Sequence, residues 1–397
     1  MFVGGYADYI KSIILEDVMA SKAIKKRKTE NEYGKMDITF FSLVIILLTV
    51  GLVMLFSASY AYSLEYYNNS YKFITRQAAF GVFGVVVMLI MSRIDYHFWK
   101  KFAWAFYIIT VLMLLILLIF PPMVSGMDVK RWIVIGPINF QPSEVAKFAI
   151  ILLFSALISS NYKQMKDFKF IVFLGAILAA TCGLIVLEPH LSATVLVLAI
   201  GVVLMVVGGL SMKYILAGVG VVGAAGIVFV LSGAISYVSD RLNYWIDPWS
   251  DAQGKGFQTI QSLLAIGSGG ILGRGIGQSR QKYLYLPEPH NDFIFSIVCE
   301  ELGLIGASVI IILFCLLVWR GFTIAMHSKD KFGSLMALGL TFQVGLQAML
   351  NIWVVTNTIP NTGISLPFFS YGGTSLVILL AEMGIVLSVS RGANIEK

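Results

Sequence analysis

Long apolar segments separated by short polar ones fill the chain from residue 37 onward. Most of these segments hold roughly 20 residues, the length that an α-helix needs to cross a bilayer. A helix satisfies its own backbone hydrogen bonds in lipid, and the apolar–polar alternation of a membrane β-barrel is absent. The pattern therefore predicts an all-α polytopic membrane protein with about ten transmembrane helices. We expect the spans at residues 38–60, 72–92, 102–121, 143–160, 169–188, 191–209, 213–233, 292–319, 333–357 and 374–390.

The first 36 residues differ from the rest, because they are polar and carry the basic run KKRK at residues 25–28. They lack the layout of a cleavable signal peptide, since a full-length span follows them. We expect residues 1–36 to be a mobile cytoplasmic extension, with contact to anionic lipid as the alternative. Residues 37–397 then form one membrane domain, with a long extracytoplasmic loop at about residues 234–291 before the eighth span.

Composition agrees with this class, since 58% of the 397 residues are hydrophobic and only 13% are charged. Soluble domains carry about 25% charged residues. Lys and Arg concentrate on one side of the predicted spans, which places both termini in the cytoplasm. The net charge of +7 is therefore interpreted as cytoplasmic loop charge and not as a nucleic-acid surface. The three cysteines lie scattered in apolar runs, with neither metal-ligand nor disulfide spacing.

The Lys and Arg residues on the predicted outer side gather around two loops. Arg131 belongs to the loop at residues 122–142. One interpretation of the outer cations is loop solubility, and the other is that they hold an anionic group at the outer leaflet. The second loop, at residues 234–291, contributes Arg241, Lys255, Arg274, Arg280 and Lys282.

Ionisable residues inside the predicted spans need a reason, because charge in the membrane is costly. Glu144 and Lys147 are three residues apart on one helix face and can form an ion pair, either structural or lining a groove for a polar headgroup. At least one of Glu300 and Glu301 should face the bundle interior. These acids, with Glu382 in the last span, leave a proton relay open as an interpretation.

Two glycine-rich stretches interrupt the helical pattern. Residues 265–287 do not match a dinucleotide-binding fingerprint, so their glycines predict close helix approach or re-entrant backbone. Residues 359–375 contain Pro and Gly that forbid a plain helix. We expect this second stretch, which includes Ser370, to be a loop that lines a cavity, because lipid-exposed irregular backbone is not tolerated.

Asp292 stands at the predicted start of the eighth span, in the sequence LYLPEPHNDFIF. Its simplest role is that of a helix N-cap. The Glu of a capping box is missing, since Phe295 occupies that position. The alternative role is a general base at the outer edge of the membrane, close enough to His290 for the two groups to tune each other.

Nine short motifs together give the chain a resemblance to the SEDS family (shape, elongation, division and sporulation), which comprises FtsW, RodA and SpoVE. The longest motif resembles FtsW and SpoVE more than RodA. The motifs are FSAS (56–59), RQ (76–77), IDY (94–96), KRWI (130–133), QPSEVAK (141–147), EPHLSAT (188–194), GRGIGQSRQKYLYLPEPHNDFIF (273–295), EELG (300–303) and PNTGISLPFFSYGGTS (360–375).

The resemblance implies a ten-helix enzyme of the bacterial cytoplasmic membrane that polymerises lipid II into glycan strands on the outer face. It also implies a class B penicillin-binding protein and other divisome proteins as partners, and a place at the division septum or in sporulation. The family's catalytic acid matches Asp292, and its lipid-binding groove matches Glu144 and Lys147. His190 and Ser192 depart from the family's Pro-Asp-Leu-Gly, so no role is carried over to them.

If lipid II is the substrate, chemistry assigns further roles. Asp292 would deprotonate the acceptor hydroxyl in a single inverting displacement. Positive charge must then stabilise the departing pyrophosphate, and the candidates are Arg131, Lys147, Arg241 and Lys255. A divalent metal, magnesium or manganese, is another candidate for this charge, and no other cofactor is expected. His290 and Ser370 are candidate substrate contacts beside the acid.

Two other functions compete with a polymerase. Buried acids and interrupted helices also occur in transporters, so a lipid II flippase is one alternative. The other is a non-catalytic divisome scaffold that recruits a partner through its lipid-facing helices. Two observations distinguish these alternatives from a polymerase: whether the purified protein forms glycan, and whether Asp292 is needed for its function.

Overall fold

The computed structural model of the protein describes residues 34–120, 131–135, 138–188, 190–211, 213–214, 218, 220, 243–254 and 256–393. Residues 1–33 of the N-terminal extension, almost all of the predicted seventh span, and the candidate cations Arg241 and Lys255 lie outside these residues. The expectations that concern them stay predictions.

Helices dominate the described residues, as predicted, and each expected span other than the seventh coincides with one of them. Seven helices of the described part are long and apolar enough to cross a membrane, and α5 and α8 are shorter apolar helices. The helices are α2 (Ile38–Tyr67), α3 (Lys72–Met91), α4 (His97–Lys101), α5 (Ala103–Ile119), α6 (Pro142–Ser160), α7 (Phe168–Leu187), α8 (Leu191–Val207), α11 (Phe257–Gly269), α12 (Ile294–Met326), α13 (Lys331–Val355) and α14 (Gly373–Gly392).

Short polar residues set several of the helix ends. Asp37 caps α2 by accepting a hydrogen bond from the Phe40 amide at 2.8 Å. Asp330 caps α13 in the same way, from the Gly333 amide at 2.8 Å. Side-chain oxygens suit these positions because the first amides of a helix have no intrahelical acceptor.

Two small elements were not anticipated by the apolar pattern. A two-stranded antiparallel hairpin, β1 (Ile133–Ile135) and β2 (Ile138–Phe140), precedes α6 with Ile133 opposite Phe140. The described part of the expected 234–291 loop is not a plain loop, because it contains the short 3₁₀ helix η2 (Pro248–Asp251) and α11. A second 3₁₀ helix, η1 (Tyr162–Lys166), joins α6 to α7.

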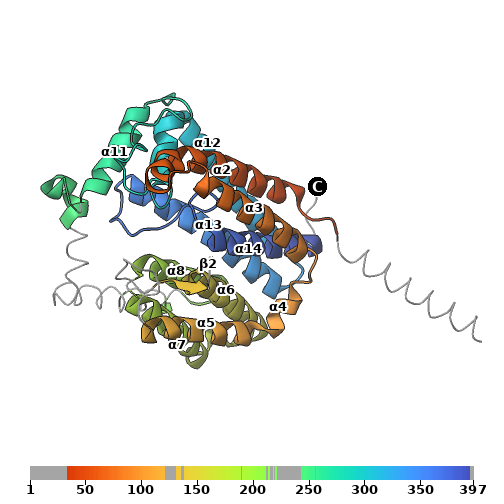
Figure 1. Ribbon diagram of the computed structural model, residues 1–397. Coiled ribbons are helices and arrows are strands. Elements are labelled where there is room, and N and C mark those ends of the chain that lie inside the picture. Colours follow the sequence, from red (N-terminus) through yellow and green to blue (C-terminus); the bar gives the residue numbers. More distant parts are fainter. Residues whose placement is uncertain are drawn as a thin grey trace, which may run out of the picture.

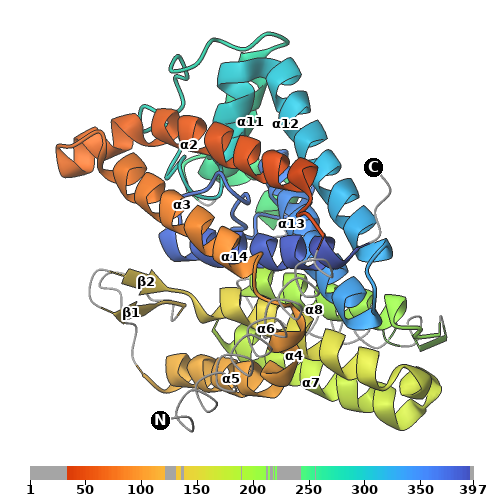
Figure 2. The ribbon, with the colours of Figure 1, turned by 90° about the vertical axis from the view of Figure 1, so that its right-hand side faces the viewer.

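The helices form two groups, which Figure 1 shows one above the other. The upper group contains α2, α3, α11, α12, α13 and α14, and the lower group contains α5, α6, α7 and α8. Contacts of α13 with α6 and α8 join the two groups. Figure 2 shows α14 crossing beneath α3 in the middle of the molecule. There Gly84 of α3 leaves room for Leu380. Small residues allow transmembrane helices to pack this closely.

One end of the bundle gathers the segments that the charge pattern placed in the cytoplasm. The Gly34 amide donates to the Arg391 carbonyl at 2.7 Å, and Arg320 Nη2 lies 2.7 Å from Asp37 Oδ2. The start of α2, α4 and the C-terminus lie together at this end, on the right in Figure 1. Segments that the charge pattern placed on the same side of the membrane therefore lie together in the structure.

The helix α12 is broken near its beginning. Gly303 has φ +67° and ψ −169°, a conformation that L residues with side chains rarely adopt. The backbone of Gly273 packs directly against this break, and a Cβ on either glycine would collide with the other segment. The glycine-rich stretch therefore makes the close backbone approach that its composition predicted.

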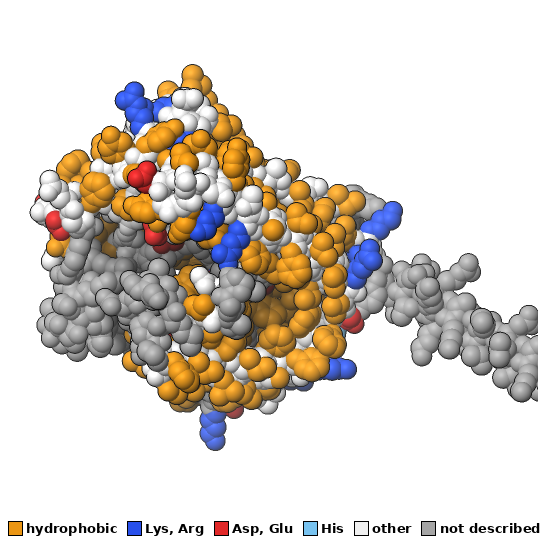
Figure 3. Space-filling view, in the orientation of Figure 1, with side chains coloured by type: hydrophobic (Ala, Val, Ile, Leu, Met, Phe, Trp, Pro, Cys, Tyr) orange, Lys and Arg blue, Asp and Glu red, His pale blue; other side chains and the backbone are white. Residues whose placement is uncertain are grey.

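The surface agrees with a membrane environment. Figure 3 shows hydrophobic side chains over most of the described surface on this face, with Lys and Arg in small groups. Trp319, Val82 and Leu304 are among the large apolar side chains that the bundle leaves exposed. Apolar atoms cover about half of an ordinary soluble surface as well, but here long helices carry them. The chain is an integral membrane protein of the all-α class.

Candidate active site

A cavity of about 710 Å³ opens between the two helix groups. Its walls come from α2, α3, α6, α8, α13 and α14, from the hairpin region before α6, and from two loops, residues 288–292 and 363–372. Six of the eight site residues predicted from the sequence line it. They are Arg131, Glu144, Lys147, His290, Asp292 and Ser370.

Asp292 is not a helix cap, contrary to its simplest expected role. The cap of α12 is Phe293, and no side chain makes a cap hydrogen bond there. The backbone of Asp292 is held instead, because its carbonyl accepts a 2.7 Å hydrogen bond from Asn351 Nδ2. A Cβ on Gly363 would lie 3.1 Å from Asp292 Oδ2, so the carboxylate rests against a residue without a side chain. No hydrogen bond joins the carboxylate to a described residue, which leaves its oxygens open to the cavity.

Burial raises the pKa of Asp292 to about 6, with a further rise from the negative charge of Glu288 and an opposing effect of Arg131. Loss of water dominates, because removing a carboxylate from solvent disfavours its charged form. A carboxylate with a pKa near 6 is a stronger base than an ordinary Asp and is still ionised at neutral pH.

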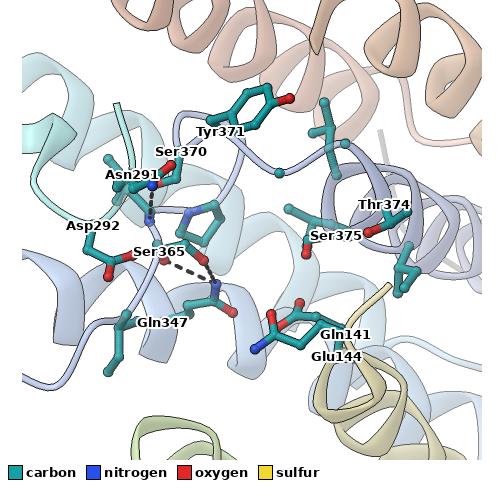
Figure 4. Close-up of a pocket in the computed structure, with 18 of the residues that line it drawn as sticks. Gln141, Glu144, Asn291, Asp292, Gln347, Ser365, Ser370, Tyr371, Thr374 and Ser375 are labelled. Atoms are coloured by element: carbon teal, nitrogen blue, oxygen red, sulfur yellow. Dashed lines mark hydrogen bonds between the residues drawn. The ribbon is translucent and has the colours of Figure 1, made fainter. Parts of the chain in front are cut away.

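Ser370 joins the two loops that form the wall around Asp292. Its hydroxyl donates to the Asn291 carbonyl at 2.8 Å and accepts from the Leu366 amide at 2.7 Å. The Tyr371 amide donates to the His290 carbonyl at 2.9 Å. Figure 4 shows Ser370 and Asn291 in contact on the same side of the cavity as Asp292. Although predicted as a substrate contact, Ser370 is placed to fix the loop that carries the acid.

Glu144 and Lys147 form the predicted ion pair, with 2.9 Å between Oε1 and Nζ. Lys147 is almost completely buried and also donates to Gln347 Oε1 at 3.0 Å. The Gln347 amide nitrogen donates in turn to the Ser365 hydroxyl at 3.1 Å. The predicted ion pair is confirmed and lines the cavity, and its binding of a polar headgroup stays a prediction. Figure 4 shows Glu144 and Gln141 across the cavity from Asp292.

A row of amides on α13, which was not predicted from the sequence, also faces this region. Gln343, Gln347 and Asn351 are spaced four residues apart, which puts them on one helix face. Gln343 donates to Glu382 Oε2 at 2.9 Å, deep in the bundle. Polar residues at this spacing in an otherwise apolar span were the signal that could have located this side of the cavity.

The turn between α7 and α8 places further polar groups near the cavity. His190 lines it and lies 3.2 Å from Ser143 Oγ through Nδ1. Burial, with the positive charges of Arg131 and Lys147, lowers the pKa of His190 to about 3, so the ring is neutral. Burial raises the pKa of Glu188 to about 8, against the opposing charge of Arg131. This turn therefore brings little charge of its own.

Four aromatic rings surround the chain just before Asp292. The centroid of His290 lies 4.4 Å from that of Phe73 and 4.8 Å from that of Tyr62. Phe73 also meets Tyr371 edge-on, with 4.8 Å between centroids. All four rings line the cavity. Composition gave no signal for this cluster, because its members come from three distant parts of the chain.

The basic residues predicted on the outer side differ in their surroundings. Lys282 is buried and lies 3.0 Å from Glu301 Oε1, so it belongs to the interior and cannot hold a ligand at the surface. The same Glu301 accepts from Ser57 Oγ at 2.6 Å. Glu300 accepts from the Arg280 amide at 2.9 Å and from the Ser279 hydroxyl. These two acids therefore fasten the glycine-rich loop to α12, and the proton relay that the sequence left open stays an untested interpretation.

No group of three or more His, Cys, Asp or Glu side chains within the described residues is placed to hold a metal ion. Of the carboxylates at the cavity, Asp292 and Glu288 come from one loop, Glu144 from α6 and Glu382 from α14. The described residues thus offer no preformed all-protein metal site, and a magnesium or manganese ion that bridges the substrate's phosphates stays a prediction.

Comparison with known proteins identifies the family. A family model described as cell cycle protein, covering FtsW, RodA and SpoVE, matches residues 37–395. The chain is 38% identical over 359 residues to stage V sporulation protein E of Bacillus subtilis, covering 89% of this chain and 97% of that protein. It is also 38% identical over 368 residues to a probable peptidoglycan glycosyltransferase FtsW of a Geobacter species, covering 90% and 98%.

Solved structures agree. A chain from a peptidoglycan synthase complex that coordinates polymerization and crosslinking matches with a TM-score of 0.74 at 27% identity, covering 90% of this chain and 98% of that one. The rod shape determining protein RodA of Thermus thermophilus matches with a TM-score of 0.66 at 25% identity, covering 91% and 98%. The resemblance seen in the nine motifs is thus confirmed over nearly the whole membrane domain, and the chain belongs to the FtsW, RodA and SpoVE family of cell cycle proteins.

Proposed function

We propose that this protein is a peptidoglycan glycosyltransferase that polymerises lipid II into glycan strands. The observation that carries the proposal is the Asp292 carboxylate, open to a large cavity, with its pKa raised to about 6 and with buried cationic charge across from it. Relatives in the family are named as probable peptidoglycan glycosyltransferases, and the activity of this chain is inferred from them together with the site.

Asp292 acts as the general base. A sugar hydroxyl is a weak nucleophile, and removal of its proton as the new bond forms accelerates attack by roughly 10²–10⁴. The acceptor oxygen attacks the donor's anomeric carbon, the bond to pyrophosphate breaks, and the hydroxyl proton passes to Asp292. One displacement inverts the configuration at that carbon, so no covalent enzyme intermediate is needed.

Arg131 and Lys147 supply positive charge for the leaving group. Pyrophosphate gains charge as it departs, and cations held in place by the fold stabilise that charge without reorganisation. Lys147 is fixed by Glu144 and Gln347, so its ammonium is preorganised. Arg241 and Lys255 remain further candidates for this role.

Location and partners follow from the same proposal. Both termini face the cytoplasm, with residues 1–36 as a cytoplasmic extension and residues 37–397 as the membrane domain. The cavity opens toward the outer leaflet. A similar chain occurs in a complex that couples polymerization to crosslinking, so we propose a class B penicillin-binding protein as the partner of this one, with other divisome proteins. The septum is the proposed site of action.

The proposal is tested by polymerisation of lipid II with the full chain, its partner penicillin-binding protein silenced for crosslinking, and products resolved on a gel. Wild type should give long glycan, and Asp292→Asn should lose at least 10²-fold in rate while keeping its thermal unfolding temperature. Asn291→Gln, a neighbour that the proposal gives no chemical role, is the comparison for local disturbance.

Two outcomes contradict the proposal. Near-normal glycan from Asp292→Asn removes the general base. Transfer of labelled lipid II across vesicles by a protein that forms no glycan with any partner favours the flippase.

A further inference from the structure

We propose that an aromatic wall beside Asp292 is the subsite that binds the acceptor sugar. The aromatic wall consists of Tyr62, Phe73, His290 and Tyr371. The inference rests on the proposed function, since it assigns one of the two sugars of that reaction to a side of the cavity.

The aromatic wall is built and held in place by the fold. Phe73 and His290 are nearly fully buried, and their rings pack with 4.4 Å between centroids. Tyr62 and Tyr371 flank them, at 4.8 Å from His290 and from Phe73 respectively. The rings are tilted or perpendicular and not stacked in a closed pile, and each of the four residues also contributes to the cavity lining.

His290 presents a polar atom that the described residues do not satisfy. Its Nδ1 is buried and has no hydrogen-bond partner there. Burial lowers the pKa of His290 to about 4, so the ring is neutral near pH 7 and each nitrogen is either a donor or an acceptor. A buried polar atom without a partner is unusual and calls for a ligand group that bonds to it.

A pyranose fits this combination. One face of a sugar ring carries C–H bonds, which pack against aromatic rings, and its edge carries hydroxyl and amide groups. A lipid acyl chain would pack against the rings but would leave His290 Nδ1 without a hydrogen-bond partner. Aromatic surface with one convergent polar group is typical of sites that recognise an amphipathic ring.

The position of the aromatic wall beside Asp292 indicates that it binds the acceptor sugar and not the donor sugar. The Tyr371 amide bonds to the His290 carbonyl at 2.9 Å, and His290 is two residues from Asp292. The wall and the base thus belong to one rigid unit. Figure 4 shows Tyr371 at the top of the cavity, Asp292 at the left and Glu144, the partner of Lys147, at the lower right. Among the cations of the cavity, Lys147 is fixed beside Glu144 and Arg76 bonds to Tyr371 of the wall. We assign the donor's pyrophosphate to Lys147 and Arg131, and the wall to the sugar whose hydroxyl Asp292 deprotonates.

The test separates the two substrates. The donor is labelled lipid II whose terminal 4-hydroxyl is capped with galactose, so it cannot accept. The acceptor is a lipid II analogue with carbon in place of the anomeric oxygen, so it cannot donate. Initial rates of coupling by the full chain with its silenced partner then give a separate KM for each substrate.

Tyr62→Leu should raise the KM for the acceptor by roughly tenfold and leave the KM for the donor within about twofold, because one ring contact is lost. Tyr62→Phe keeps the ring and should restore the acceptor KM. Tyr60→Leu, on the same helix but outside the cavity lining, is the matched control and should behave as wild type. Tyr371→Leu is the second variant, and unfolding temperatures report on folding.

An unchanged acceptor KM in both Leu variants overturns the subsite. So does an equal rise in both KM values, which would indicate a wall for the lipid tails that both substrates carry, or a rise confined to the donor. Failure of wild type to couple the two substrates under any condition counts against the proposed function itself, so the two failures are distinguishable.

Discussion

A single carboxylate shows how local surroundings set chemistry. Asp292 has neither a cap partner nor an ion pair with a described residue, and its carboxylate rests against Gly363. Gly363 has φ +66°, so an L side chain there would be strained as well as crowded against the carboxylate. The backbone of a distant loop therefore gives the acid its room, and this loop is fixed by Ser370 and Asn351.

The pH dependence of the reaction follows from Asp292. Its raised pKa means that the base is ionised above about pH 6 and is lost by protonation below it. The value of kcat/KM should therefore rise with pH through about 6 and level off above.

Removing the nearby negative charge with Glu288→Gln lowers the pKa of Asp292, so the rising limb of the profile should move to lower pH. The measurement is the initial rate of coupling between pH 4.5 and 8. Glu65→Gln, which removes an acid outside the cavity lining, should leave the limb in place. A limb that stays at the same pH in Glu288→Gln would show that another group controls it.

At the scale of elements, the helix α12 and the glycine-rich loop act as one unit. The break at Gly303 brings the loop backbone onto α12. Glu300 and Glu301 hold the loop by four hydrogen bonds from Ser279, Arg280 and Gln281 and by a fifth from Lys282. The loop then runs directly to Asp292. The contacts with α12 therefore fix the path of the loop that leads to Asp292, which lies just before the start of this helix.

Lys282→Met should weaken this unit strongly. It leaves the Glu301 carboxylate buried without its cation, and loss of one partner of a buried pair costs about 3–5 kcal/mol. Thermal unfolding in detergent measures the change, and glycan synthesis should fall with it.

Arg280→Met removes an exposed cation from the same loop and is the matched control. The double variant Lys282→Met with Glu301→Gln should recover part of the loss, because no charge is then left unpaired. Equal unfolding temperatures for Lys282→Met and Arg280→Met would refute the role of the pair.

At the scale of the whole molecule, the two ends of the bundle have different tasks. One end holds the cavity, and the other is tied together by polar contacts between distant segments. Asp330 is the centre of that second end. It accepts from the Tyr96 hydroxyl at 2.5 Å and lies 2.9 Å from His97 Nε2, while it also caps α13.

Asp330 links stability to pH. Burial opposes its charge, but the Tyr96 hydroxyl, the Gly333 amide and His97 together hold the pKa of Asp330 below its usual value of 3.8. A lowered folded-state pKa means that this stabilisation is present above about pH 3.8 and is lost as the pH falls through the folded-state value.

Asp330→Asn should therefore destabilise the protein by about 1–2 kcal/mol at pH 7, and the difference from wild type should shrink toward pH 3. Unfolding temperatures across this range check the prediction. Asp167→Asn, an exposed cap at the start of α7, should cost less. A difference that grows as the pH falls would contradict the linkage.

The sequence predicts what depends on local pattern and not what depends on assembly. Apolar length located the spans, and spacing predicted the pair of Glu144 with Lys147. The aromatic wall and the hairpin were missed, because rings from α2, α3 and two loops meet only in the packed bundle. Lys282 was misplaced on the surface for the same reason, since a basic residue in a loop looks alike whether it is solvated or paired.

The amide row on α13 has a consequence for how the protein is made. Among the seven long helices, α13 is the least hydrophobic, because Gln343, Gln347 and Asn351 replace apolar side chains. Such a segment partitions weakly from the translocon into lipid by itself. Its neighbours α12 and α14 must retain it during synthesis, so the polar groups that furnish the cavity also make biogenesis of the last three helices a cooperative event.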